Sequence, residues 1–199
     1  MMPSTGYAEQ LTLTNGQQVA MDLLPKDVAV WRAKARAELY EGSGWTTDGR
    51  RKAPFYVRDF EGNLLVRGGA SLMWEYARGN GSTASTAAKK YLNATGALGV
   101  GNSTAAAANT QTALQGTNLL KAFTAGYPTH TTGSTAAVVQ DLVMKSTFGV
   151  TEANFVWNEF GCFNKATTAN RRMLTRKVQN LLTKTSAASA TLTVTVTLS

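Results

Sequence analysis

The chain has 199 residues, a formal net charge of +8 and a single cysteine, Cys162, so one full-sized core is possible and an internal disulfide scaffold is excluded. Charged residues make up only 16% of the chain, against about 25% in ordinary domains. We find no signal-peptide pattern at the N-terminus and no apolar run near the roughly 20 residues of a membrane span. These observations predict a protein that is made in a cytoplasm and has no membrane partner.

The first segment with clear periodicity follows an irregular lead-in. Residues 1–26 carry two prolines and two glycines and predict an extended N-terminal arm ahead of a single domain over residues 27–199. From Trp31 to Leu39 apolar and charged residues alternate strictly, which favours a half-buried strand. The same residue types are good helix formers, so a helix over residues 28–41 stays an open alternative.

A turn-rich connection and a hairpin signal come next. Gly42–Lys52 is rich in turn residues, and Phe55–Phe60 and Leu64–Arg67 flank the turn Glu61-Gly62-Asn63. This arrangement predicts that the two flanking segments pair as a hairpin. Apolar residues at helical spacing then predict a short helix over Ala70–Arg78.

Strands are easier to place in the second half of the chain, after a flexible loop predicted over residues 79–90. The most secure is Thr191–Leu198, a pure alternation of Thr with Leu or Val, and we expect its removal to destroy folding. The other predicted strands are Tyr91–Gly101, Leu119–Ala125, Ala136–Gly149, Phe155–Phe163 and Met173–Asn180.

Several strands separated by turn signals, with one short helix, predict a mainly β fold. We expect an antiparallel β-sandwich or barrel, with most of the aromatic residues in its core.

The basic residues form short clusters in predicted turns rather than one stripe, and they lie apart from the aromatic residues in the sequence. The most prominent cluster is Arg50, Arg51 and Lys52, which is the candidate interaction site. A stripe with interleaved aromatics would be typical of a nucleic-acid binder. We therefore favour solvated loops or an acidic protein surface as the partner over nucleic acid.

The sequence holds few of the parts that an active site requires. His130 is the only histidine and stands in a turn-like loop, and with one Cys it cannot complete a zinc site. Gly99-Val100-Gly101 lacks the further residues of a phosphate-binding loop. We therefore expect no cofactor and no metal.

Glu159 is the most interesting carboxylate, because it stands in an otherwise apolar and aromatic strand. A hydrolase would need a second carboxylate beside it, and Glu152 and Asp141 are the nearest in the sequence. We favour a structural role, in which Glu159 is bound by backbone N–H groups or by a basic residue such as Arg172 or Arg176.

Three ordered pieces of the second half are similar to a group of virion structural proteins of tailed bacteriophages, described as tail, baseplate, fibre-associated or capsid-decorating. The first piece is Ala97–Leu114, similar to a strand with "LGxG" and a loop rich in small residues. The second is Trp157–Phe163, similar to "W-x-E-x-G-x-F". The third is Met173–Arg176 with Leu192–Thr197, similar to "ML-x-R" and "LTVTxT".

The resemblance implies a non-enzymatic particle component that assembles with other virion proteins and with copies of itself. It also implies a location in the virion, after synthesis in the host bacterial cytoplasm, on the capsid, neck or tail. The alternatives are a module that binds a host glycan or nucleic acid and, third, a hydrolase built on Glu159. The structural motif residues are Gly99, Gly101, Trp157, Glu159, Gly161, Phe163 and Arg176.

Overall fold

The structure is a computed structural model, and it describes residues 31–62, 64–77, 95–130, 140–168 and 171–198. The arm predicted over residues 1–26 and the flexible loop predicted over residues 79–90 lie outside these ranges. The described residues are mainly β, as the sequence predicts.

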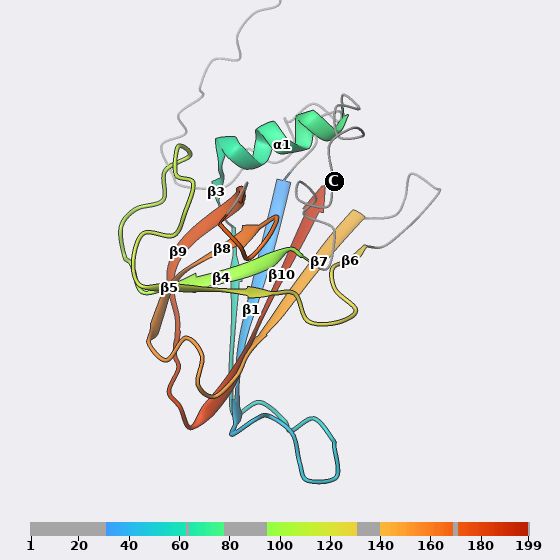
Figure 1. The fold of residues 1–199 in the computed structure, drawn as a ribbon, viewed down its shortest axis with the longest axis vertical. Coiled ribbons are helices and arrows are strands. Elements are labelled where there is room, and N and C mark those ends of the chain that lie inside the picture. The colour runs from blue at the N-terminus through green and yellow to red at the C-terminus, as the bar shows by residue number, and fades with distance from the viewer. Residues whose placement is uncertain (1–30, 63, 78–94, 131–139, 169–170, 199) are drawn as a thin grey trace, which may run out of the picture.

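Two five-stranded antiparallel sheets pack face to face as a β-sandwich (Figure 1). The first sheet has the strand order β2-β1-β10-β7-β6, and the second has the order β3-β9-β8-β4-β5. The elements are β1 (Trp31–Glu41), β2 (Tyr56–Glu61), β3 (Leu64–Leu65), α1 (Arg67–Ala77), β4 (Ala97–Gly101), β5 (Asn118–Ala122), β6 (Thr129–His130), β7 (Gln140–Phe148), β8 (Val156–Phe163), β9 (Met173–Thr183) and β10 (Ala188–Leu198).

The strand reading of the first periodic segment is confirmed, because β1 is a strand along its whole length. Its small residues Ala33, Ala35 and Ala37 are buried, whereas the basic residues between them face solvent. The predicted C-terminal strand is also confirmed as β10, which pairs with β1 from Trp31↔Leu198 to Glu41↔Ala188. On its other side β10 pairs with β7, so it lies in the middle of the first sheet.

The main core lies between the two sheets and receives apolar side chains from both. Leu192 and Val194 enter it from the first sheet, and Leu98 and Phe160 enter it from the second. Phe148 and Trp157 meet across the gap with ring centroids 4.9 Å apart and an edge-to-face geometry. Such aromatic pairs add to the stabilisation that burial alone provides.

A second, smaller apolar cluster lies on the other face of the second sheet. It contains Val66, Ala97, Leu114, Phe163 and Met173. Leu114 belongs to the segment between β4 and β5, so this segment folds back over the sheet and covers it. The second sheet is therefore buried on both faces around Gly99 and Gly161, which both approach Leu114.

The hairpin predicted around Glu61-Gly62-Asn63 is wrong. β2 pairs with β1 in the first sheet, whereas β3 pairs with β9 in the second. Gly62 has a φ of +74°, which suits the turn, but the chain crosses there from one sheet to the other. Burial of Val66 explains the crossing. Val66 follows β3 and packs in the second apolar cluster, which we call the outer cluster, and a β3 paired with β2 would leave Val66 away from it.

Element bounds also differ from the predicted ones. The predicted strand Leu64–Arg67 is reduced to Leu64–Leu65, because α1 begins at Arg67 rather than at Ala70. His130, predicted in a loop, lies in the two-residue strand β6, and its Nδ1 is 3.3 Å from the carbonyl oxygen of Asp141.

Polar contacts join the two sheets along both sides of the sandwich. Beside β2, Arg58 donates to the Oδ1 of Asn180 at 3.3 Å. Beside β5, the hydroxyl of Ser146 donates to the carbonyl of Lys121 at 2.9 Å. No helix in the described part of the chain combines the length and the apolar character that crossing a membrane requires.

Candidate functional site

Glu159 and Arg176 form a fully buried ion pair on neighbouring strands of the second sheet. Both side chains have an exposed fraction of zero, and the Nη2 and Nε atoms of Arg176 each lie 2.7 Å from Oε2 of Glu159. β8 and β9 position them, because Gly161 is opposite Arg176 in the register and Glu159 is two residues before Gly161 on the same face. The predicted basic partner of Glu159 is thereby confirmed as Arg176.

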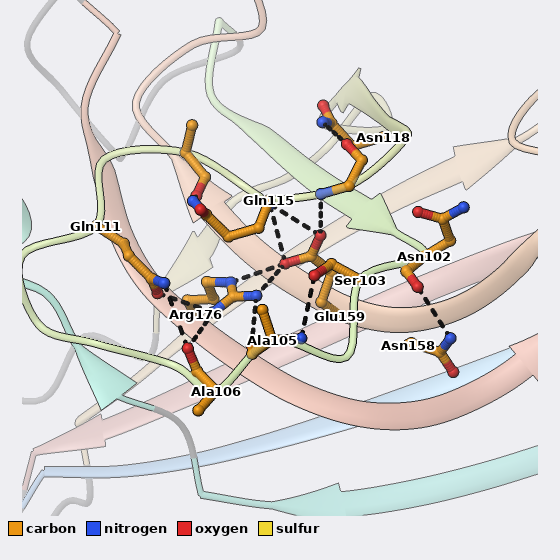
Figure 2. Close-up of polar contacts among 12 residues, drawn as sticks. Asn102, Ser103, Ala105, Ala106, Gln111, Gln115, Asn118, Asn158, Glu159 and Arg176 are labelled. Atoms are coloured by element: carbon orange, nitrogen blue, oxygen red, sulfur yellow. Dashed lines mark hydrogen bonds and ion pairs between the residues drawn. The ribbon is translucent and has the colours of Figure 1, made fainter.

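The remaining donors of Arg176 hold the segment between β4 and β5, residues 102–117, which we call the β4–β5 loop. Nη2 donates to the carbonyl of Ala105 at 2.9 Å, and Nη1 donates to the carbonyl of Ala106 at 3.1 Å. Nη1 also donates to Oε1 of Gln111 at 2.8 Å. A guanidinium has five N–H donors, and each of them has an acceptor here (Figure 2).

Glu159 holds the other end of the β4–β5 loop. Its Oε1 accepts the backbone N–H groups of Gln115 at 3.0 Å and of Gly116 at 3.1 Å (Figure 2). Removing a carboxylate and a guanidinium from water costs several kcal/mol for each ion. The full set of hydrogen bonds offsets that cost, so the pair acts as a clamp on a loop that has no regular secondary structure. We call it the Glu159–Arg176 clamp.

The glycines of the predicted motif make room for the clamp and for the loop. A Cβ on Gly101 would come within 2.5 Å of Oε1 of Glu159. A Cβ on Gly99 would lie 3.0 Å from a methyl group of Leu114, and one on Gly161 would lie 3.0 Å from the backbone oxygen of Thr175. Gly99 is opposite Gly161 in the register, so the glycines form a trough on the outer face of the sheet.

The motif residue Trp157 lies apart from the others. Simple alternation would put it on the same face as Glu159, but a register shift lies between these two residues. Trp157 therefore enters the main core, where its indole N–H donates to the carbonyl of Ala153 at 2.9 Å. Phe163 lies in the outer cluster beneath the β4–β5 loop, on the face of the sheet that carries the clamp.

The geometry leaves Glu159 poorly placed for acid–base chemistry, since a substrate has no exposed carboxylate oxygen to approach. The two carboxylates considered as its partners are engaged elsewhere. Glu152 accepts from Lys121 at 2.5 Å, and Asp141 accepts from the hydroxyl of Thr197 at 2.5 Å. Within the described ranges, no group of three or more His, Cys, Asp or Glu side chains gathers to hold a metal ion.

Cys162 is equally protected from reaction. It lies in the main core, and its burial raises the pKa of the thiol to about 12. A thiol with such a pKa holds almost no thiolate at neutral pH, so it is a poor nucleophile.

The candidate interaction residues lie in the connection between β1 and β2, residues 42–55, which we call the β1–β2 loop. Its arms pair with each other, since the N–H of Thr46 donates to the carbonyl of Arg50 at 2.9 Å and that of Lys52 donates to the carbonyl of Gly44 at 3.0 Å. The loop extends beyond the sandwich at the end far from α1 (Figure 1).

The predicted separation of basic and aromatic residues is wrong at this loop. The guanidinium of Arg51 lies 4.0 Å from the ring centroid of Tyr40 and 5.3 Å from that of Trp45. Trp45 is 50% exposed, so it is an exception to the prediction that most of the aromatic residues lie in the core. Trp45 stands between Gly44 and Thr46 in a turn-rich segment, and this sequence context was a signal for exposure.

Sequence reasoning missed the residues that complete the clamp. Ala105, Ala106 and Gly116 take part through their backbone atoms, and their side chains carry no sign of that role. Comparison of the chain with known protein families, with curated proteins and with solved structures yields no match.

Proposed function

We propose that this chain is a non-enzymatic structural component of a tailed bacteriophage virion, which assembles with other particle proteins and with copies of itself. The proposal starts from the similarity of three ordered sequence pieces to virion structural proteins. One observation supports it best: residues from all three pieces meet at the Glu159–Arg176 clamp or pack directly beneath the loop that it holds. Trp157 and Leu192, which belong to the same pieces, lie in the main core instead.

The buried position of the clamp also favours this proposal over a hydrolase. An acid–base carboxylate must reach its substrate, whereas Glu159 is enclosed and bound by Arg176 and two backbone N–H groups. In a protein that must keep its shape in many copies, the same contacts serve to hold a surface loop in one conformation.

The experiment is to locate the protein in purified particles. Tailed particles from a lysate of a bacterium that produces this chain are separated on a density gradient, and peptides of the chain are quantified across the fractions by mass spectrometry. We expect the peptides to sediment with the particles and gold-labelled antibodies to bind at regular positions on them. The isolated protein, run on the same gradient, is the control. Peptides that stay with the free proteins would contradict the proposal.

A second candidate function is a binding module for a host glycan, and the exposed Trp45 beside Arg51 favours it. Exposed aromatic rings are common platforms for sugar rings. A glycan array with the full chain separates the two readings, because saturable binding that Trp45→Ala abolishes would favour the module.

A further inference from the structure

The large exposed apolar residues of the described chain gather at one end of the sandwich. Val156, at the start of β8, is opposite Thr183, and the hydroxyl of Tyr56 donates to the carbonyl of Leu181 at 3.3 Å, so β2 and β8 begin at the same end. The β1–β2 loop leaves the sandwich there (Figure 1). The five residues are Trp45 (50% exposed), Phe55 (65%), Tyr56 (37%), Val57 (38%) and Val156 (36%).

We call this region the β1–β2 end. Successive residues of a strand point to opposite sides, so Tyr56 and Val57 lie on opposite sides of β2, and the exposed apolar residues surround this end rather than one face. Exposed aromatic residues are enriched at sites of protein–protein interaction. Phe55 and Trp45 have the size and stiffness of residues that anchor interfaces.

The β1–β2 end is also basic. From Glu41 to Arg58 the chain has four basic and two acidic residues, a net charge of +2, within a protein of net charge +8. Arg50 pairs with Asp48 at 3.3 Å, and Lys52 pairs with Glu41 at 3.6 Å. Three of these four side chains are more than half exposed, so each pair contributes little and can be exchanged for a partner's carboxylate.

Arg51 is positioned differently from its two neighbours. Its guanidinium is held against the rings of Tyr40 and Trp45 and its Nη2 atom is buried there, so Arg51 supports the loop rather than offering a donor to another molecule.

The charge and the exposed apolar residues indicate which kind of molecule binds this surface. A second copy docking through the same end would bring two cationic loops together, which like-charge repulsion opposes. Nucleic acid would use the cations and Trp45, but its backbone offers little apolar surface to cover Phe55, which is 65% exposed. An acidic protein surface with an apolar centre complements both the charge and the exposed side chains.

We propose that the β1–β2 end is a docking surface for an acidic protein of the particle, with Trp45 and Phe55 as apolar anchors and Arg50 and Lys52 as carboxylate-binding residues. This inference rests on the proposed virion function for the identity of the partner.

The test is photocrosslinking in the bacteria that produce the particles. The full chain carries a benzophenone amino acid in place of Phe55, and crosslinked peptides are identified by mass spectrometry. We expect one adduct, formed with an acidic segment of another protein. The charge-reversed chain, Arg50→Glu with Lys52→Glu, should lose about tenfold of the adduct, since opposed charges then repel.

The matched control reverses two exposed cations on the same sheet, Arg32→Glu with Lys34→Glu, and has the same net charge. It should keep the adduct, and circular dichroism should show both variants folded. The absence of an adduct, equal loss in the two variants, an adduct with a second copy of this chain, or an adduct that nuclease removes would each overturn the docking proposal.

The same cells separate this proposal from the proposed function. If the adduct forms with an acidic protein but the chain is absent from gradient-purified particles, the docking surface stands and the virion function falls. If the chain is present in particles but forms no adduct, the virion function stands and the docking surface falls.

Discussion

Two long hairpin loops in the described part of the chain make the same kind of connection but differ in their physical character. Each joins antiparallel strands that are neighbours in one sheet, β1 with β2 and β4 with β5. The β4–β5 loop has no charged or aromatic residue and is held by a buried ion pair. The β1–β2 loop is rich in charge, exposes Trp45 and is held by surface contacts.

Burial thus determines which loop is a fixed part of the structure and which loop can contact another molecule. The polar groups that hold the β4–β5 loop are fully used within the protein, so that loop is a third layer over the second sheet. The β1–β2 loop keeps exposed apolar area and exchangeable charges, so it remains able to contact another molecule. The following experiments alter matched residues in the two regions.

The largest difference is expected between the arginines. Arg176→Met leaves the carboxylate of Glu159 buried without its cation, which should lower the free energy of unfolding by about 3–5 kcal/mol. Arg50→Met removes an exposed pair and should cost less than about 1 kcal/mol. Urea denaturation measures both, and equal costs would refute the distinction between clamp and surface pair.

A glycine substitution tests the space around the clamp. Gly101→Ala puts a methyl group 2.5 Å from Oε1 of Glu159, and the resulting displacement should cost about 1–3 kcal/mol. Gly149→Ala is the control, because its nearest neighbour is 3.5 Å away, and it should change stability by less than about 1 kcal/mol. Thermal unfolding measures both, and a neutral Gly101→Ala would show that the clamp can move.

Acid should weaken the contacts of Glu38 beside the β1–β2 loop. Glu38 accepts the hydroxyl of Tyr40, and the ring of Tyr40 is the one on which Arg51 of the loop lies. Partial burial would raise the pKa of Glu38, but hydrogen bonds from Tyr40, Arg36 and Thr191 together lower it below its ordinary value. An acid with a lower pKa in the folded state stabilises the fold above its unfolded pKa, and this contribution is lost as the pH falls through the folded pKa. Glu38→Gln should therefore flatten the acid side of the stability profile, as measured by urea denaturation at a series of pH values. An unchanged profile would count against this role.

The smallest effect is expected at the exposed anchor. Phe55→Ala should change the free energy of unfolding by no more than about 0.5 kcal/mol, since the side chain is 65% exposed. Phe163→Ala, beneath the β4–β5 loop, should cost about 3–5 kcal/mol. Calorimetry on the two variants is the measurement, and a large loss at Phe55 would mean that this residue is structural rather than available.

Much of the fold could be predicted because local pattern and tertiary structure agree in it. The alternation in Trp31–Leu39 and Thr191–Leu198 has the period of a strand with one buried face, and both segments are strands. The turn at Gly62 was correctly recognised as a turn, but the sheet that each flanking strand joins depends on β9, which comes over a hundred residues later.

The candidate site was also only partly predictable from the sequence. The sequence identifies Glu159, because a charge in an apolar strand needs a partner, and it offers Arg176 as one such partner. The capture of the β4–β5 loop could not be predicted, since it uses backbone atoms of alanine and glycine. The side on which Trp157 lies depends on a bulge that the residue pattern does not reveal.

The central position of β10 sets the order in which the molecule can be assembled. During synthesis β1 and β2 leave the ribosome early, but the strand that lies between β1 and β7 consists of residues 188–198. Until those residues emerge, the apolar face of β1 and the open edge of β7 have no partner, and both invite association with other nascent chains. Completion of the first sheet is therefore a late and long-range event, which makes its folding slow and leaves the partly formed sheet exposed to aggregation.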